Sequence, residues 1–177
     1  MYSIKAGTVA LLILLTTACG GITDDLRPSG ADQRGGNGNV EPTTIANLSL
    51  PSIDGGVIDV ASLLEDHDGV VLYFTMWCPV CDSHMSHLRS AQTSRFPRVA
   101  FVLVDYVSGS VNEARMAATA AGFAGPPFMV AADTAGEAED RLQATMGTTV
   151  VIGPGMRLLL NEDYKDGAKL AETLAGL

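Results

Sequence analysis

Apolar and polar positions along the chain first predict a β-hairpin and two buried strands. Leu48 to Ile53 and Val57 to Val60 are strand-like and flank Asp54-Gly55-Gly56, a turn sequence typical of hairpins. Continuous apolar runs at 69–74 and 99–107 are typical of central strands with both faces covered. In the first half of the domain, the pattern therefore predicts a hairpin followed by the central strands of a sheet.

Helical spacing appears between and after these strands. Cys81, Met85, Leu88 and Ala91 recur at helical intervals. Further helices are predicted at 61–64, 111–121, 136–146 and 166–174, and further strands at 128–132, 148–152 and 156–160. Strands that alternate with helices and end in a hairpin predict an α/β domain of three layers, α/β/α, with a central mixed β-sheet.

The first 42 residues show a different pattern. Residues 1–18 contain one lysine, an apolar run and small residues, which is typical of a secretory signal peptide. Small residues that end at Cys19 resemble a bacterial lipobox, which implies lipidation of Cys19. Residues 19–42 are rich in Gly, Asn, Asp and Pro and predict a flexible linker. The folded domain is expected at 43–177.

Composition narrows the functional classes. The chain has 177 residues, of which 47% are hydrophobic and 18% charged, enough for one domain with a sizeable core. Its formal net charge is −9 and it has no cluster of Lys and Arg, so a nucleic-acid partner is not expected.

The stretch Trp77-Cys78-Pro79-Val80-Cys81 carries the candidate chemistry. The chain has three cysteines, so a lipidated Cys19 leaves only this pair. Pro79 suits the first position of a helix, which places Cys78 at a helix N-terminus, where a thiolate is stabilised. We therefore expect Cys78 to be the nucleophile with a lowered pKa and Cys81 to resolve the mixed disulfide.

These residues resemble a known family. VVLYFTMWCPVC is similar to the strand-to-active-site segment of thioredoxin-like proteins, especially TlpA-like (redoxin) membrane-anchored thiol-disulfide oxidoreductases, and the likeness covers most of the chain after residue 43. The resemblance implies a thioredoxin-like fold with an N-terminal β-hairpin and a redox-active disulfide in place of any cofactor. It also implies a substrate surface, for which we expect Trp77, Pro79, Gly147 and Thr148.

Two positions depart from the family pattern. Gly147 stands where the family has a cis-proline, which predicts a more flexible loop opposite the cysteines, with a looser hold on the substrate. The buried carboxylate that thioredoxin has six residues before its first cysteine is Leu72 here. Proton transfer at Cys81 then needs another group or water, and Asp82 and Asp105 are the nearby carboxylates in the sequence.

A metal site would be a different use of the same residues. Cys78, Cys81, His84 and His87 recur every three residues, and such ligands suit copper or zinc, as in a copper chaperone. Three-residue steps drift by about 60° around a helix, so four side chains do not converge on one ion. We interpret His84 and His87 as solvent-exposed and predict no metal site.

The motif also fits a peroxidase or a binding module. Phe74 to Pro79 is similar to the FTxxCP of thiol peroxidases of the peroxiredoxin type, in which the hydroxyl of Thr75 would bind peroxide. A non-catalytic binding module with a structural disulfide would fit the cysteine spacing as well.

Together, the patterns predict an extracytoplasmic thiol-disulfide oxidoreductase. The lipid would hold it on the outer side of a bacterial membrane, in the periplasm or at the cell surface. Its expected partners are proteins that carry a disulfide or dithiol, and a thiol electron donor in the membrane or periplasm.

Overall fold

The core of the protein is a six-stranded mixed sheet. In the computed structural model of the chain, the described residues are 43–177, so the predicted signal peptide, lipidated Cys19 and linker lie outside them. The strand order is β1-β8-β7-β4-β5-β6. The strands are β1 (Thr43–Thr44), β4 (Gly69–Thr75), β5 (Val99–Asp105), β6 (Met129–Ala132), β7 (Thr148–Gly153) and β8 (Arg157–Asp163).

Strand directions confirm a mixed sheet. β4, β5 and β6 are parallel, whereas β7 is antiparallel to both β4 and β8, and β1 is antiparallel to β8. Every residue of β4, β5 and β7 is buried, which the continuous apolar runs predicted for β4 and β5.

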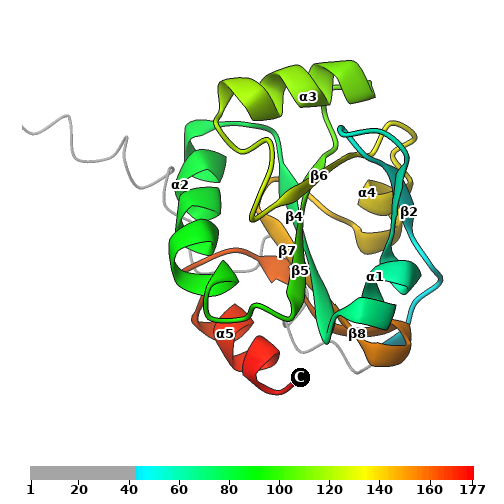
Figure 1. The fold of residues 1–177 in the computed structure, drawn as a ribbon, viewed down its shortest axis with the longest axis vertical. Helices are drawn as coiled ribbons and strands as arrows, with labels where there is room; N and C mark the ends of the chain where they lie inside the picture. The colour runs from blue at the N-terminus through cyan, green and yellow to red at the C-terminus, as the bar shows by residue number, and fades with distance from the viewer. Residues whose placement is uncertain (1–42) are drawn as a thin grey trace, which may run out of the picture.

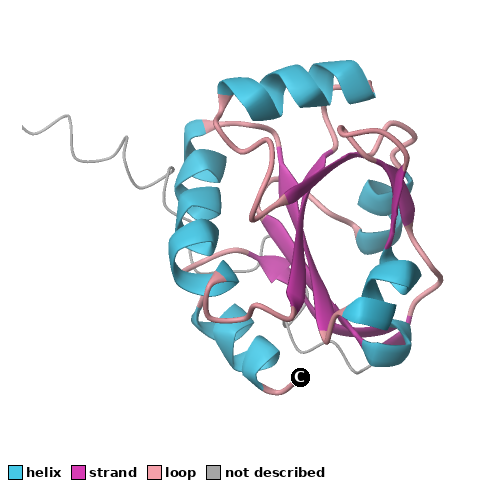
Figure 2. Ribbon diagram, viewed as in Figure 1, coloured by secondary structure: helices cyan, strands magenta, loops and turns pink. Residues whose placement is uncertain are grey.

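Helices cover both faces of the sheet, which confirms the three-layer α/β/α architecture (Figures 1 and 2). The helices are α1 (Val60–Asp66), α2 (Pro79–His87), α3 (Val111–Ala120), α4 (Glu137–Leu142) and α5 (Ala168–Ala175). A π-helical segment, Leu88–Thr93, extends α2, and a 3₁₀ turn, Pro154–Met156, joins β7 to β8. In Figure 1, α2 and α5 lie on one side of the sheet and α1 and α4 on the other.

Alternate residues of the central strand supply the two halves of the core. Tyr73 belongs to the hydrophobic cluster that includes residues of α2, α3 and α5. Its neighbours Leu72 and Phe74 belong to the cluster with residues of α1 and α4. Because side chains alternate across a strand, β4 aims Tyr73 toward the helix that begins beside Cys78.

The predicted hairpin forms a small separate sheet. β2 (Ser49–Pro51) pairs antiparallel with β3 (Val57–Asp59). A bridge from Ser52 to Ala131 joins this hairpin to the edge strand β6. The Asp59 side chain accepts a hydrogen bond from Ser62 N–H and so caps α1 directly after the hairpin.

Two of the predicted boundaries that are wrong bear on the site. The helix predicted at 136–146 ends at Leu142, because Gln143 adopts a left-handed conformation and Ala144 N–H closes the turn onto the carbonyl of Glu139. The strand predicted at 99–107 ends at Asp105, whose carboxylate binds the backbone of the turn that follows. Both corrections matter for the site, since they fix the positions of Met146 and Asp105.

Within residues 43–177, no helix is long and apolar enough to cross a membrane.

Candidate active site

Two free thiols lie together where β4 gives way to α2. Cys78 is the N-cap of α2, and its Sγ accepts a hydrogen bond from Cys81 N–H at 3.3 Å. The sulfur atoms of Cys78 and Cys81 are 2.9 Å apart. Cys78 is half-buried, whereas Cys81 is fully buried. A substrate can therefore reach only the sulfur of Cys78.

The two thiols share their ionisation. Burial raises the pKa of Cys78, and the hydrogen bond with Cys81 raises it further. Burial opposes ionisation of Cys81, but hydrogen bonds from the Cys78 thiol and from the backbone at Met76 outweigh it and hold the pKa of Cys81 below its usual value. The prediction of a lowered pKa at Cys78 is therefore wrong: the pKa of Cys78 is raised, and the lowered pKa belongs to Cys81, whose thiolate the Cys78 thiol stabilises. Acidity favours Cys81, whereas access favours Cys78 as the thiol that an incoming disulfide would meet.

Trp77 is clamped beside the thiols by a buried carboxylate. Its indole Nε1–H donates to Asp105 Oδ2 at 2.6 Å, and its backbone has a left-handed conformation with φ 58°. Asp105 also accepts hydrogen bonds from Ser108 Oγ and from the N–H groups of Val107 and Ser108. The sequence identified Asp105 only as a possible proton-transfer group, whereas the structure shows that it positions Trp77.

The loop before β7 faces the cysteines. Met146 is partly exposed, and the thiol of Cys78 donates to its Sδ at 3.4 Å. Gly147 has φ 85°, and its N–H donates to the carbonyl of Phe74 at 3.0 Å. Its carbonyl accepts from Tyr164 N–H at 2.8 Å. A proline could not form the bond to Phe74, so glycine allows this loop to be joined to the sheet at that point.

The other predicted substrate contacts divide into exposed and buried residues. Pro79 is exposed at the first turn of α2. Thr148 is fully buried, and its hydroxyl pairs with Thr145 N–H and Asp163, so its side chain does not reach a substrate. Thr75 is also fully buried; its hydroxyl accepts from Trp77 N–H and lowers the pKa of Cys81.

The prediction that the histidines are solvent-exposed is wrong. His84 is buried, and its Nδ1 lies 2.9 Å from the hydroxyl of Tyr73. His87 is half-buried, and its Nδ1 lies 2.5 Å from the hydroxyl of Tyr164. Burial, followed by repulsion from His87, lowers the pKa of His84. Their tyrosine partners lie far away in the sequence, which is why the helical spacing gave no sign of them.

These rings form a layer of polar side chains under the cysteine pair. The rings of His84 and Tyr164 are 4.9 Å apart, and Tyr73 meets both edge-on. Burial raises the pKa of Tyr73, and a charge on Cys81 raises it further, so the phenol stays protonated while its hydroxyl shares a hydrogen bond with Nδ1 of His84. Tyr73 is the titratable side chain of β4, and its pKa responds to the charge of both cysteines.

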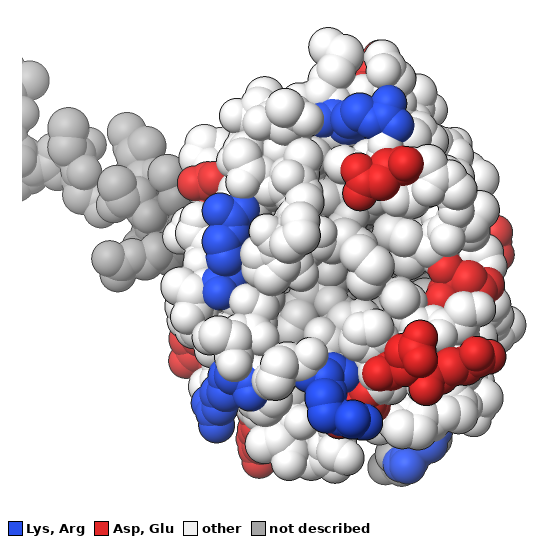
Figure 3. All heavy atoms as spheres, in the orientation of Figure 1, with Lys and Arg blue, Asp and Glu red and all other residues white. Residues whose placement is uncertain are grey.

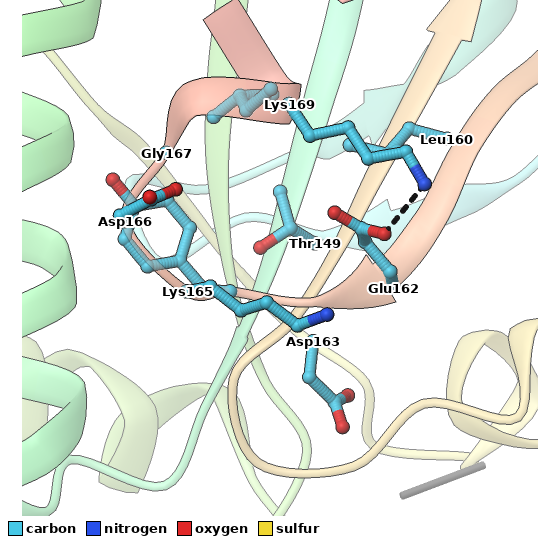
Figure 4. Close-up of a pocket in the computed structure, with 10 residues that line it drawn as sticks. Thr149, Leu160, Glu162, Asp163, Lys165, Asp166, Gly167 and Lys169 are labelled. Atoms are coloured by element: carbon cyan, nitrogen blue, oxygen red, sulfur yellow. Dashed lines mark hydrogen bonds and ion pairs between the residues drawn. The ribbon is translucent and has the colours of Figure 1, made fainter. Parts of the chain in front are cut away.

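A small cavity of about 100 Å³ lies between β7, β8 and the start of α5 (Figure 4). An ion pair between Lys169 and Glu162, at 2.9 Å, crosses its wall. The residues around it are Thr149, Leu160, Glu162, Asp163, Tyr164, Lys165, Asp166, Gly167, Lys169 and Leu170. Neither cysteine lines this cavity, so it is not the candidate active site.

Charged side chains of both signs lie at the surface. On the face shown in Figure 3, basic and acidic side chains are interspersed around neutral surface. Across residues 43–177, no group of three or more His, Cys, Asp or Glu is arranged to hold a metal ion.

Comparison with known proteins gives structural neighbours alone. No family model matches the chain, and no curated protein matches it. Among solved structures, a thioredoxin-like protein from Aeropyrum pernix is 17% identical, with a TM-score of 0.61 over 74% of this chain and 89% of that one.

Two mycobacterial structures are also similar to this chain. Peroxidoxin BcpB from Mycobacterium tuberculosis is 22% identical, with a TM-score of 0.61. The match covers 77% of this chain and 95% of that one. A secreted M. tuberculosis disulfide oxidoreductase homologous to E. coli DsbE is 21% identical, with a TM-score of 0.56 over 73% and 96%. At these identities the likeness concerns the fold, and the chain has the thioredoxin-like fold that its sequence predicted.

Proposed function

We propose that the protein is an extracytoplasmic thiol-disulfide oxidoreductase that reduces disulfides in protein substrates through Cys78 and Cys81. The observation that carries this proposal is the pair of sulfurs 2.9 Å apart at the N-terminus of α2, one accessible and one buried. The pair is itself the redox group, so the reaction needs no other cofactor.

The proposed reaction transfers two electrons in two exchanges. The Cys78 thiolate attacks one sulfur of the substrate disulfide, forms a mixed disulfide and releases the first substrate thiolate. The Cys81 thiolate then attacks Cys78 Sγ, closes the Cys78–Cys81 disulfide and releases the second thiolate. Protons from the two cysteines end on the substrate thiols. A dithiol donor in the membrane or periplasm would reverse both steps and restore the pair.

The surface around Cys78 supports a protein substrate. Met76, Val107 and Met146 are 45%, 49% and 37% exposed, although large apolar side chains are usually buried. Trp77 is held in place by Asp105, and Pro79 is exposed beside the nucleophile. An extended peptide with a cysteine could pack apolar side chains here while its disulfide meets Cys78.

The predicted location belongs to the same proposal. The signal-like residues 1–18 and the lipobox-like sequence at Cys19 support export and attachment by lipid. One structural neighbour is described as secreted. We propose attachment to the outer side of a bacterial membrane. Metabolic labelling with a fatty acid tests the anchor: Cys19→Ser should abolish labelling, and labelling that persists would contradict it.

The catalytic proposal is tested by insulin reduction and by trapping. With dithiothreitol as donor, the full chain should accelerate insulin reduction, and Cys78→Ser should abolish the acceleration. Cys81→Ser should accumulate a mixed disulfide at Cys78, because no resolving thiol remains. The matched control, Cys19→Ser, should reduce insulin at the unchanged rate. A chain that neither cycles its disulfide nor reduces insulin would leave a binding module as the better interpretation.

A peroxidase is less well supported, although one neighbour is a peroxidoxin. In a peroxidase, the hydroxyl of Thr75 would have to bind peroxide beside Cys78. Here it is buried, accepts a hydrogen bond from Trp77 N–H and lowers the pKa of Cys81. Stopped-flow measurement of peroxide consumption by the reduced chain tests for this activity.

A further inference from the structure

The two thiols belong to a cluster of three sulfur atoms that disulfide exchange does not fully use. Cys78 Sγ lies 2.9 Å from Cys81 Sγ and 3.4 Å from Met146 Sδ. A thioether cannot take part in disulfide exchange, so the sulfur of Met146 has no role in that reaction. We propose that the reduced protein binds one Cu(I) ion through Cys78 Sγ, Cys81 Sγ and Met146 Sδ.

The donor atoms select the ion. Thiolate and thioether sulfur are soft ligands that favour Cu(I). Structural zinc sites need four ligands from Cys, His, Asp and Glu, and the described residues hold no cluster of even three of these. His84 is not the missing ligand through Nδ1, because that atom already pairs with the hydroxyl of Tyr73.

The geometry requires a small local change. Three sulfurs about 2.3 Å from one ion, the length of a typical metal–thiolate bond, lie about 4 Å from each other. The two cysteine sulfurs must therefore separate by roughly 1 Å from their 2.9 Å spacing. Met146 has three rotatable bonds and is partly exposed, and Cys78 lies at the end of a helix, so both side chains can adjust.

The backbone holds Met146, the third proposed ligand, across from the two cysteines. Gly147, directly after Met146, donates its N–H to the carbonyl of Phe74 in the strand that leads to Cys78. This bond joins the Met146 loop to the cysteine loop. The 37% exposure of Met146 leaves the cluster open to an incoming ion. A proline at position 147 would lack the N–H that donates this hydrogen bond to Phe74.

Binding is an exchange of ions without electron transfer. Two thiols lose their protons and one Cu(I) takes their place, so the thiolates carry two negative charges against one positive charge. In the oxidised form the sulfurs are joined to each other and supply no thiolate. Cu(I) binding and the disulfide are therefore mutually exclusive, and the ion would protect the reduced pair from oxidation.

Anaerobic titration tests the site. We would titrate Cu(I) into the reduced full chain carrying Cys19→Ser, so that Cys78 and Cys81 are its only thiols, in competition with bathocuproine disulfonate. One Cu(I) per chain is expected, and none for the oxidised chain. Met146→Leu, which keeps the volume but removes the sulfur, should weaken binding by about 10- to 100-fold.

Met116→Leu is the matched control, because Met116 is exposed on α3, and it should leave the Cu(I) affinity unchanged. X-ray absorption at the copper edge should show three sulfur neighbours in the parent and two in Met146→Leu. Equal Cu(I) affinity in parent and Met146→Leu, or substoichiometric binding by the reduced parent, would overturn the proposal. Neither result bears on insulin reduction, so the failure of this site would be distinct from the failure of the oxidoreductase.

Discussion

At the scale of single residues, Asp105 and Trp77 show how a buried carboxylate can position an aromatic side chain next to the cysteine pair. Asp105 is 2% exposed and accepts four hydrogen bonds, one of them from the indole. We predict that Asp105→Ala lowers the free energy of unfolding by about 2–3 kcal/mol, because two N–H groups and the indole lose a buried acceptor. It should also release the indole toward water.

Trp77 is the only tryptophan in the chain, so its fluorescence reports on this contact directly. Asp105→Ala should shift the emission of the folded protein to longer wavelength and lower the midpoint of urea denaturation. Glu65→Ala, an exposed change on α1, should alter stability by less than about 0.5 kcal/mol and leave the emission unchanged. Unshifted emission in Asp105→Ala would show that the indole does not depend on this carboxylate.

His84 makes a second prediction at this scale, concerning pH. Burial, followed by repulsion from His87, lowers its pKa below 6.5 in the folded protein, so the unfolded chain takes up a proton first as the pH falls. The His84 contribution to stability is therefore fully present above about pH 6.5 and decreases below it, by at most about 1.4 kcal/mol per pH unit.

Denaturation between pH 7.5 and 5.5 measures this slope above the range in which carboxylates dominate. His84→Gln, which keeps a polar partner for Tyr73 but cannot take up a proton in this range, should flatten the curve. His67→Gln, at the end of α1 and outside this cluster, is the matched control and should retain the slope. An unchanged slope in His84→Gln would place the pH dependence on other groups.

At the scale of elements, α5 depends on one glycine at its start. Gly167 has φ 75°, and a Cβ there would lie 2.7 Å from Tyr164 Oη and 3.0 Å from Gln92 Nε2. We predict that Gly167→Ala costs about 2–4 kcal/mol of unfolding free energy, from backbone strain together with overpacking. Near-UV circular dichroism should report the displaced Tyr164 ring.

Gly136 supplies the matched control, because it also precedes a helix with φ 68° but has nothing within 4 Å of its added Cβ. Gly136→Ala should therefore lose only the strain, about 1–2 kcal/mol, in the same denaturation measurement. Equal losses at the two glycines would mean that the surroundings of Gly167 yield without cost.

Elements with a strong local pattern could be predicted from the sequence. The apolar run of β4 and Pro79 after it were enough to place Cys78 at a helix start, as observed. The end of α4 could not be predicted in this way, because Gln143 adopts the left-handed conformation without being glycine. The predicted helix included Met146, and its actual end frees that residue to meet Cys78.

Contacts between segments that are distant in the sequence could not be predicted either. The bonds of His84 to Tyr73 and of His87 to Tyr164 join α2 to β4 and to the chain after β8. Periodicity within α2 contains no information about these partners. A buried histidine and an exposed one give the same sequence signal unless the opposing strand is known.

At the scale of the whole molecule, the sheet order brings the site together. β4 lies between β5 and β7, so the segments that follow β4 and β5 and the one that precedes β7 meet at one edge. Cys78, the last residue of β5 (Asp105) and Met146 lie at this edge, although complete strands and helices separate them in the sequence. The surroundings of the cysteine pair therefore depend on the folded domain as a whole.

This dependence leads to a prediction about stability and the direction of electron transfer. If the protein donates electrons, folding must favour the Cys78–Cys81 disulfide over the dithiol, the reverse of an oxidant whose reduced form is stabilised. Urea denaturation of the full chain in its oxidised and reduced forms should then give the larger unfolding free energy for the oxidised form. Each 1.4 kcal/mol of difference lowers the reduction potential by about 30 mV below that of the unfolded pair. Equilibration with glutathione measures the same potential independently, and Cys81→Ser, which cannot form the disulfide, should show no difference between the two conditions. A more stable reduced form would make the protein an oxidant of thiols.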